Sequence, residues 1–172
     1  MRIKSILLLT IGIIFTLGSI IPQNLHMPVK DANHHDFNSK SFWHYPWGKS
    51  GTHKGIDIFA QKGTLIRSST LGIVLFTGSV KRGGNVVLIL GPKWRLHYYA
   101  HIDQIPDKIP FYLSQTSLIG TVGTSGNATG NQPHLHYSIM TLIPYPWRID
   151  KSPQGWKKMF YLNPGDFLIP DS

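Results

Sequence analysis

The sequence combines regularly placed histidines with the absence of both glutamate and cysteine. Three motifs hold most of the residues that could do chemistry: His53-x3-Asp57, Tyr99-x-His101 and His134-x-His136. Zinc in proteins is bound by Cys, His, Asp or Glu, and a catalytic zinc site uses three such side chains and leaves a fourth position for water. A zinc site in this chain would therefore be built from histidine and aspartate, and the motifs offer more than the three ligands required.

The spacing within the motifs limits which side chains can meet. Residues two apart on a β-strand project from the same face, so His134 and His136 would lie side by side, about 7 Å apart. One of them can then bind a metal while the other faces a substrate. Between His53 and Asp57, a glycine and β-branched isoleucines favour a turn that enters a strand over a helix. We therefore expect this pair to converge from a loop end and the strand after it.

Several other hydrolytic chemistries do not fit these residues. The HExxH metalloprotease helix and the His-x-Glu deaminase motif both need a glutamate. The glycines between 120 and 130 match neither a dinucleotide-binding nor a phosphate-binding loop, and they indicate tight turns instead. The sequence Gly123-Thr-Ser125-Gly126 falls short of the G-x-S-x-G nucleophile elbow. A glycosidase would need a carboxylate pair, and most of the eight aspartates lie in turn-like or terminal contexts.

The elements that must position the motifs are predicted to be short strands. Six runs are rich in β-branched or aromatic residues and are separated by Gly, Pro or Asn: 64–69, 72–77, 86–90, 94–100, 117–122 and 135–140. No segment after residue 21 shows a sustained helical period. These runs predict an all-β domain, a twisted antiparallel sheet folded over a central groove. The tail from 143 to 170, rich in Pro, Trp and Tyr, is expected to wrap the core as irregular structure.

From about Phe42 to about Leu162 the chain resembles the lysostaphin/LytM-type zinc metallopeptidases, a family of peptidoglycan endopeptidases. That family has an H-x3-D motif, a later Y-x-H and a terminal H-x-H in the same order. The resemblance implies that zinc is bound by His53, Asp57 and His136. It also implies that His101 and His134 are the two histidines beside the reacting water.

Further segments are similar to the family, and one departs from it. The similar segments are the turn at Gly83 to Asn85, the glycine-rich run 120–130 and the closing Asn163-Pro164. Asn131 and Gln132 separate Thr129-Gly130 from the histidine strand, whereas many members run almost directly from one to the other. This difference lengthens a loop at the mouth of the cleft, and it concerns substrate preference more than metal binding.

The N-terminus predicts export. Arg2 and Lys4 precede an uncharged, mostly apolar run from 5 to 21, which is the layout of a secretory signal. Its length of about 17 residues also suits the shortest transmembrane helices, so a cleaved signal peptide and an uncleaved signal anchor both remain open. In either case the basic end stays inside. The expected organisation is a signal peptide or signal anchor at 1–21, a polar linker at 22–41 and a zinc metallopeptidase domain at 42–172.

The formal net charge of +9 indicates an anionic partner. An excess of Lys and Arg attracts polyanions without specifying which one. Because the domain is expected to be exported, an anionic cell wall or membrane surface is the predicted partner, and nucleic acid is not. The charges are scattered along the chain, so a generally basic soluble surface is the plain alternative.

Together these features predict a monomeric, zinc-dependent peptidoglycan endopeptidase of the periplasm or cell envelope. It would hydrolyse peptide bonds in stem peptides or cross-links, with a D,D-type cross-link favoured over a polyglycine bridge. The alternative is a catalytically silent domain of the same fold that binds the wall or regulates a wall hydrolase. His97 shares a predicted strand face with Tyr99 and His101, so it either lines the cleft or is an ordinary polar strand residue. The remaining histidines are expected in the linker or just after it: His26, His34, His35 and His44.

Overall fold

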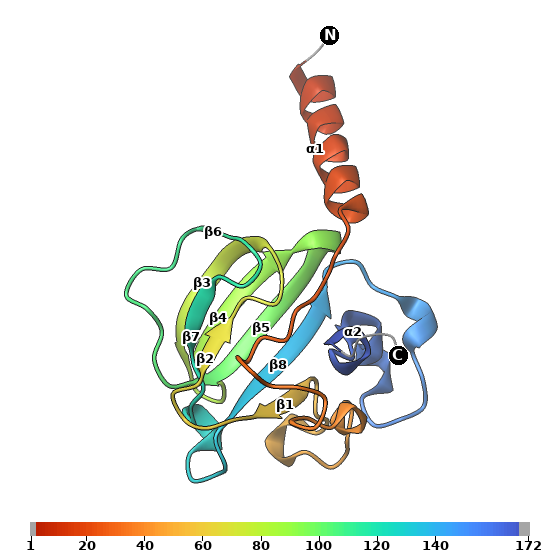
Figure 1. The fold of residues 1–172 in the computed structure, drawn as a ribbon. Coiled ribbons are helices and arrows are strands. Elements are labelled where there is room, and N and C mark those ends of the chain that lie inside the picture. Colours follow the sequence, from red (N-terminus) through yellow and green to blue (C-terminus); the bar gives the residue numbers. More distant parts are fainter. Residues whose placement is uncertain (1–2, 169–172) are drawn as a thin grey trace.

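The computed structural model describes residues 3–168 and consists mainly of antiparallel β-sheet (Figure 1). The larger sheet has the order β1-β8-β5-β4-β3-β6, with β9 pairing with β8. Its strands are β1 (Ile56–Phe59), β3 (Gly72–Val80), β4 (Gly84–Gly91), β5 (Arg95–Ile102), β6 (Tyr112–Leu113), β8 (His134–Thr141) and β9 (Tyr161–Leu162). A second sheet pairs β2 (Leu65–Arg67) with β7 (Leu118–Thr121). The predicted all-β class and all six predicted strands are confirmed.

Alternation along the strands separates a core face from a groove face. In β1, Ile56 and Ile58 are fully buried, while Asp57 and Phe59 point to the opposite side. Ile66 of β2 belongs to the same hydrophobic cluster as the core residues of the larger sheet, so the smaller sheet contributes to that core. The register pairs Asp57 with His136 and Phe59 with His134 across β1 and β8. Pairing alone therefore brings an aspartate beside the histidine motif.

The segment 22–41, predicted as a linker, contributes to the core of the domain. Val29 and Phe37 are buried, and each forms a β-bridge, with Ile66 and Ile58 respectively. The polar composition of the segment suggested a spacer. Its two buried apolar side chains nevertheless pair with strands of both sheets, where burial removes their apolar surface from water.

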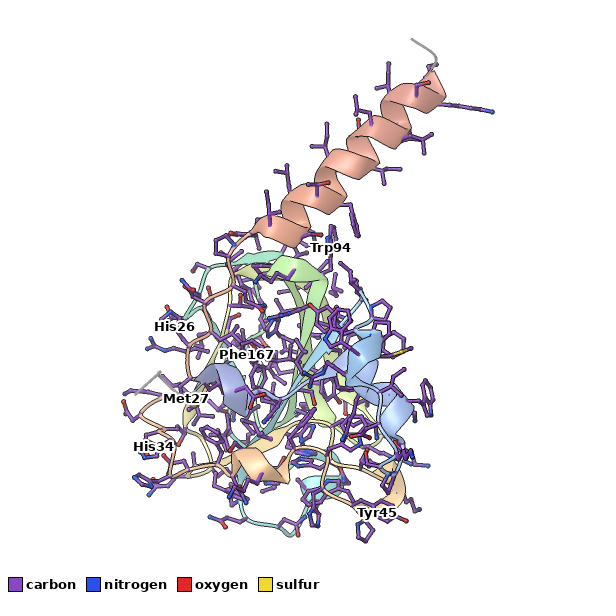
Figure 2. All side chains as sticks on the ribbon, turned by 90° about the vertical axis from the view of Figure 1, so that its right-hand side faces the viewer. His26, Met27, His34, Tyr45, Trp94 and Phe167 are labelled. Carbon is purple, nitrogen blue, oxygen red and sulfur yellow. The ribbon has the colours of Figure 1, made fainter. Side chains whose placement is uncertain are left out.

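The helix α1 (Ile3–Ile20) projects away from the domain (Figure 1). Trp94 lies at its base, where its indole stacks on Phe15 and its Nε1 donates to the Phe15 carbonyl at 3.0 Å (Figure 2). The helix is long and apolar enough to cross a membrane, and a signal sequence would meet the same criteria. Arg2 of the predicted basic flank and residues 169–172 of the predicted domain lie outside the described residues.

The tail is built from short elements joined by irregular segments. They are the 3-10 helices η5 (Pro146–Arg148) and η6 (Gly155–Phe160), strand β9 and the helix α2 (Gly165–Leu168). Leu162 and Leu168 anchor the tail in the core. The other 3-10 helices are η1 (Ser39–Ser41), η2 (Gly48–Ser50), η3 (Pro92–Trp94) and η4 (Gly126–Ala128).

Candidate metal centre

His53, Asp57 and His136 bring three ligand atoms together on the groove face. His53 Nε2 lies 3.1 Å from Asp57 Oδ1 and 3.1 Å from His136 Nδ1, and His136 Nδ1 lies 2.8 Å from Asp57 Oδ1. His53 comes from the loop before β1, Asp57 from β1 and His136 from β8, which agrees with the expected convergence of a loop end and a strand. His53 is fully buried, while the other two side chains are partly open to the groove.

The hydrogen bonds on the far side of each imidazole fix where its proton lies. His53 Nδ1 is 3.0 Å from the Ser41 carbonyl, which can only accept, so Nδ1 carries the hydrogen. Ser138 Oγ donates its one hydrogen to the Lys54 carbonyl at 2.6 Å, and it must therefore accept from His136 Nε2 at 3.1 Å. In the neutral rings, His53 Nε2 and His136 Nδ1 consequently carry lone pairs.

Three acceptors thus face one another with no hydrogen among them. Two imidazole lone pairs and a carboxylate at 2.8–3.1 Å repel unless a cation sits between them. Zinc accepts this donor set, and ligand atoms at 2.0–2.1 Å in tetrahedral geometry are about 3.4 Å apart. The residues therefore fit a divalent metal of the zinc type in donor chemistry, spacing and orientation.

The pKa values agree with a site that favours positive charge at its centre. Burial raises the pKa of Asp57, but hydrogen bonds and positive charge from His136 and His53 when they are protonated lower it more, so it lies well below its usual range once positive charge is at the centre. Burial lowers the pKa of His136, although Asp57 opposes this shift. The carboxylate is therefore ionised and the imidazole is neutral at pH 7, which is the protonation that metal ligands need.

Two residues beside the ligands explain why the local sequence takes this form. A side chain at Gly55 would meet the Tyr137 carbonyl at 2.4 Å and Ser138 Oγ at 2.6 Å, so only glycine allows this loop to approach β8. Trp47 stacks on the His53 ring with 4.2 Å between centroids. The sequence reasoning missed Trp47, Ser41 and Ser138; only Ser138 had a signal, since it lies two residues beyond His136 on the same strand face.

His101 reaches the groove through a β-bulge. Asn85 pairs with Ile102 and Val87 with Tyr99, so two residues of β5 oppose one residue of β4. His101 itself has φ of 65°. The bulge turns its side chain to the groove, where its ring centroid is 6.0 Å from that of His136.

Backbone contacts from two loops hold His101 and His134 in place. His101 Nδ1 donates to the Ser125 carbonyl at 2.9 Å, and His134 Nδ1 donates to the Gln132 carbonyl at 2.7 Å. Nε2 of each ring is therefore the nitrogen that can accept a proton, and the two ring centroids are 5.0 Å apart. Burial and, after it, the charge of His136 lower the pKa of His101 to about 4, so this ring is neutral at pH 7.

His97 does not line the groove, although strand alternation placed it on one face with His101. It is fully buried on the core side, and its Nδ1 lies 2.7 Å from the Tyr137 hydroxyl. Its Nε2 lies 2.9 Å from Nε2 of Gln23. Burial and, to a smaller extent, the charge of Arg95 lower the pKa of His97 to about 3. The bulge that redirects His101 is what separates the two histidines.

The groove contains two adjoining cavities. The first, of about 440 Å³, contacts His53, His101 and His136 and is lined by Lys54, Arg82 and Lys157; we call it the basic cavity. The second, of about 620 Å³, contacts Asp57 and His134 and is lined by Phe59, Lys81, Asn131 and Gln132. Trp47, Lys49, Arg82, His101 and His136 are among the residues that border both.

Asn131 and Gln132, which separate Thr129-Gly130 from the histidine strand, affect the groove in two ways. Both residues line the second cavity, as expected of a loop at its mouth. In addition, the Gln132 carbonyl orients the His134 ring. The longer loop thus contributes to the position of a candidate proton-transfer residue as well as to the shape of the groove.

Comparison with known proteins agrees with this architecture. Residues 51–150 match Peptidase family M23. The DD-carboxypeptidase/endopeptidase Mpg of Neisseria meningitidis is 36% identical over 85 residues, covering 49% of this chain and 19% of that protein. The peptidoglycan DD-endopeptidase ShyA of Vibrio cholerae is 29% identical over 150 residues, covering 74% of this chain and 34% of that protein. The chain therefore spans well under half of the length of these relatives.

A solved structure shares the same fold. The catalytic domain of the antimicrobial peptidase lysostaphin from Staphylococcus simulans superimposes with a TM-score of 0.59 at 25% sequence identity. The superposition covers 74% of this chain and 87% of that domain.

Proposed function

Because the chain belongs to peptidase family M23, we propose that it is a zinc-dependent peptidoglycan endopeptidase. The observation that carries the proposal is the triangle of three lone-pair-bearing atoms from His53, Asp57 and His136. Relatives in the family are endopeptidases, and one is named for peptidoglycan. The proposed substrate is a stem peptide or cross-link, with a D,D-type cross-link favoured.

In this proposal, His53, Asp57 and His136 would hold the zinc ion. When bound, zinc supplies an acidified water and a polarised carbonyl at neutral pH. The Ser41 carbonyl and the Ser138 hydroxyl keep both imidazoles in the tautomer that presents a lone pair to the site. The ligand geometry is thus fixed by contacts that do not depend on the substrate.

Proton transfer would fall to His101 and His134. His101 is neutral at pH 7, and its Nε2 can take a proton from the attacking water. The protonated ring keeps its Nδ1–H bond to Ser125 and can return the proton from Nε2 to the leaving amine. His134 also holds its Nδ1–H on a backbone carbonyl, so it would present an Nε2–H only as an imidazolium. One ring would then accept the proton of the water as a neutral base, while the other, in its protonated form, would stabilise the oxyanion or protonate the amine.

The placement of α1 is consistent with an exported domain that acts away from a membrane. Trp94, directly before β5, contacts α1, whereas His101 lies at the other end of β5. The strand rises about 3.3 Å per residue, so the start of β5 and His101 are roughly 20 Å apart. Whether α1 is retained as an anchor or removed as a signal, we propose that the groove works on cell wall outside the cytoplasmic membrane.

Purified sacculi test the proposal. We expect the protein to contain about one zinc ion per chain and to release shorter cross-linked fragments with new free amines. Chelation should abolish the release, and zinc should restore it. Reducing-end sugars should not increase, because the lining of the groove, as far as residues 3–168 form it, contains one carboxylate rather than a pair. Mass spectra with every cross-link intact after digestion by zinc-loaded protein would contradict the endopeptidase proposal and favour the wall-binding alternative.

A further inference from the structure

The groove contains more positive charge than its own carboxylates balance. Five cationic side chains line it: Lys49, Lys54, Lys81, Arg82 and Lys157. Asp57 is the only acidic residue among its lining in the described part of the chain, and it faces the imidazoles. Within residues 3–168, no ion pair joins any of the five to an aspartate.

Some lysines outside the groove do form ion pairs with aspartates. Lys62 pairs with Asp103 at 3.0 Å, and Lys158, adjacent in sequence to Lys157, pairs with Asp150. Lys157 instead faces the basic cavity. What distinguishes the groove is therefore the gathering of five cationic side chains around one carboxylate in its described lining, rather than the lack of ion pairs by itself.

The cations of the basic cavity are held in place by neutral acceptors. Lys54 Nζ donates to the Ser50 carbonyl at 2.9 Å and to the Thr52 carbonyl at 3.3 Å. Arg82 Nη1 donates to the Lys49 carbonyl at 3.3 Å. Lys157 Nζ lies 3.5 Å from Gln154 Oε1. An ammonium has three donors and a guanidinium five, so these contacts orient the groups and leave hydrogens and charge for a ligand.

We propose that the basic cavity binds a carboxylate of the substrate next to the scissile bond, through Lys54, Arg82 and Lys157. The cavity also borders His53, His101 and His136, so a carboxylate there would lie beside the reacting carbonyl. Charge-assisted bonds from guanidinium and ammonium groups are the usual partners of carboxylates. This inference rests on the proposed function and narrows its substrate to peptides with a free carboxylate at that position.

Two matched substrates test the preference. They are a D,D-cross-linked dimer of stem tetrapeptides with free carboxylates and the same dimer with carboxamides. Full-length, zinc-loaded protein in neutral detergent should have a kcat/KM at least about 10-fold higher for the acid, mainly through KM. The double variant Arg82→Gln/Lys157→Gln should lose most of this preference. Lys54 is left intact because its ammonium also binds the loop before His53.

Two single variants separate a defined site from a general attraction. Lys108→Gln removes the same charge from an exposed loop outside both cavities and should keep the acid-to-amide ratio. Lys81→Gln removes one positive charge from the second cavity and should change the acid-to-amide ratio of kcat/KM by less than about 3-fold. If Lys81→Gln lowered the acid-to-amide ratio as much as Arg82→Gln/Lys157→Gln does, the proposed site would be overturned in favour of diffuse attraction.

Calorimetry on chelated protein distinguishes this inference from the proposed function. Without zinc the protein should still bind the acid dimer more tightly than the amide, with an advantage that decreases at higher salt. If the acid is preferred in binding while zinc-loaded protein hydrolyses neither dimer, the carboxylate site stands and the endopeptidase proposal fails. If both dimers are cut and bound equally well, the endopeptidase proposal stands and the carboxylate site is refuted.

Discussion

Histidines lie on both faces of the large sheet, and their hydrogen bonding is opposite in kind. On the core face, His97 accepts at Nε2 from the Gln23 amide and donates from Nδ1 to Tyr137, so each ring nitrogen is satisfied. On the groove face, lone pairs of His53 and His136 meet each other and a carboxylate. The same residue type therefore stabilises the fold on one face and requires a cation on the other.

Among the variants that test this comparison, Asp57→Asn should have the largest effect. The substitution keeps the shape of the side chain but removes the anionic ligand, and we expect zinc content and cross-link hydrolysis to fall to background. Elemental analysis and the sacculus assay measure both. Asp107→Asn, in the loop before β6, serves as the matched control and should retain full zinc and activity. Full zinc occupancy in Asp57→Asn would rule out the ligand assignment.

His101→Ala and His134→Ala are expected to give the next largest effect. Each should keep its zinc, because neither side chain belongs to the ligand triangle. Each should lose hydrolysis by about 10²-fold or more, the usual scale for removing a general base or an oxyanion donor. Steady-state kinetics together with zinc analysis check this. If His134→Ala lost its metal while His136→Ala kept it, the two strand positions would have to be exchanged.

The same comparison shows which parts of the molecule the sequence could predict. The strand runs and the convergence of His53 with Asp57 follow from local composition, so they were predictable. The choice of His136 rather than His134 as a ligand came only from the family resemblance. The position of His101 was not predictable, because its bulge depends on how β4 and the loop at Ser125 pack around it. Likewise, Val29 and Phe37 lie in a polar segment, and their burial depends on sheet edges that are distant in sequence.

Very short elements were also beyond sequence reasoning. Strands β6 and β9 contain two residues each, too few for any alternation to be recognised. The hydrogen bonds that fix the tautomers of the ligand histidines could not be predicted either, for another reason. The Ser41 carbonyl is a backbone group, and no residue type in the sequence marks it as a partner of His53.

On the core face, His97→Gln should affect stability rather than chemistry. The amide carries both of its polar atoms on one terminal carbon and cannot place one at each ring-nitrogen position, so we expect a loss of about 1–3 kcal/mol in the free energy of unfolding. Zinc content should be unchanged and kcat/KM should remain within about 3-fold of wild type. Urea unfolding and the sacculus assay measure the two quantities. A loss of zinc in this variant would show that the two faces are coupled and would break the comparison.

Acid should lower the free energy of unfolding through protonation of His97. Its pKa is about 3 in the folded protein and about 6.5 when unfolded, so the unfolded state binds more protons between these values. Stability therefore decreases as the pH falls below about 6.5, and the contribution of His97 at pH 5 is a loss of about 2 kcal/mol. Chelated wild-type protein should lose about that much more between pH 7 and pH 5 than chelated His97→Gln. Equal losses would show that His97 is not buried as a neutral ring.

The smallest effect tests the lone-pair argument directly, in protein without metal. The side-chain amide that Asp57→Asn introduces can donate one hydrogen to His53 Nε2 and one to His136 Nδ1, where wild type has only acceptors. In chelated protein this variant should be more stable than wild type by about 1 kcal/mol, although it cannot bind zinc. Asp57→Ala supplies no hydrogen and should gain less, which separates donation from mere relief of repulsion. If Asp57→Asn were instead less stable than chelated wild type, the assigned tautomers would be wrong, because hydrogens would already lie between the three side chains.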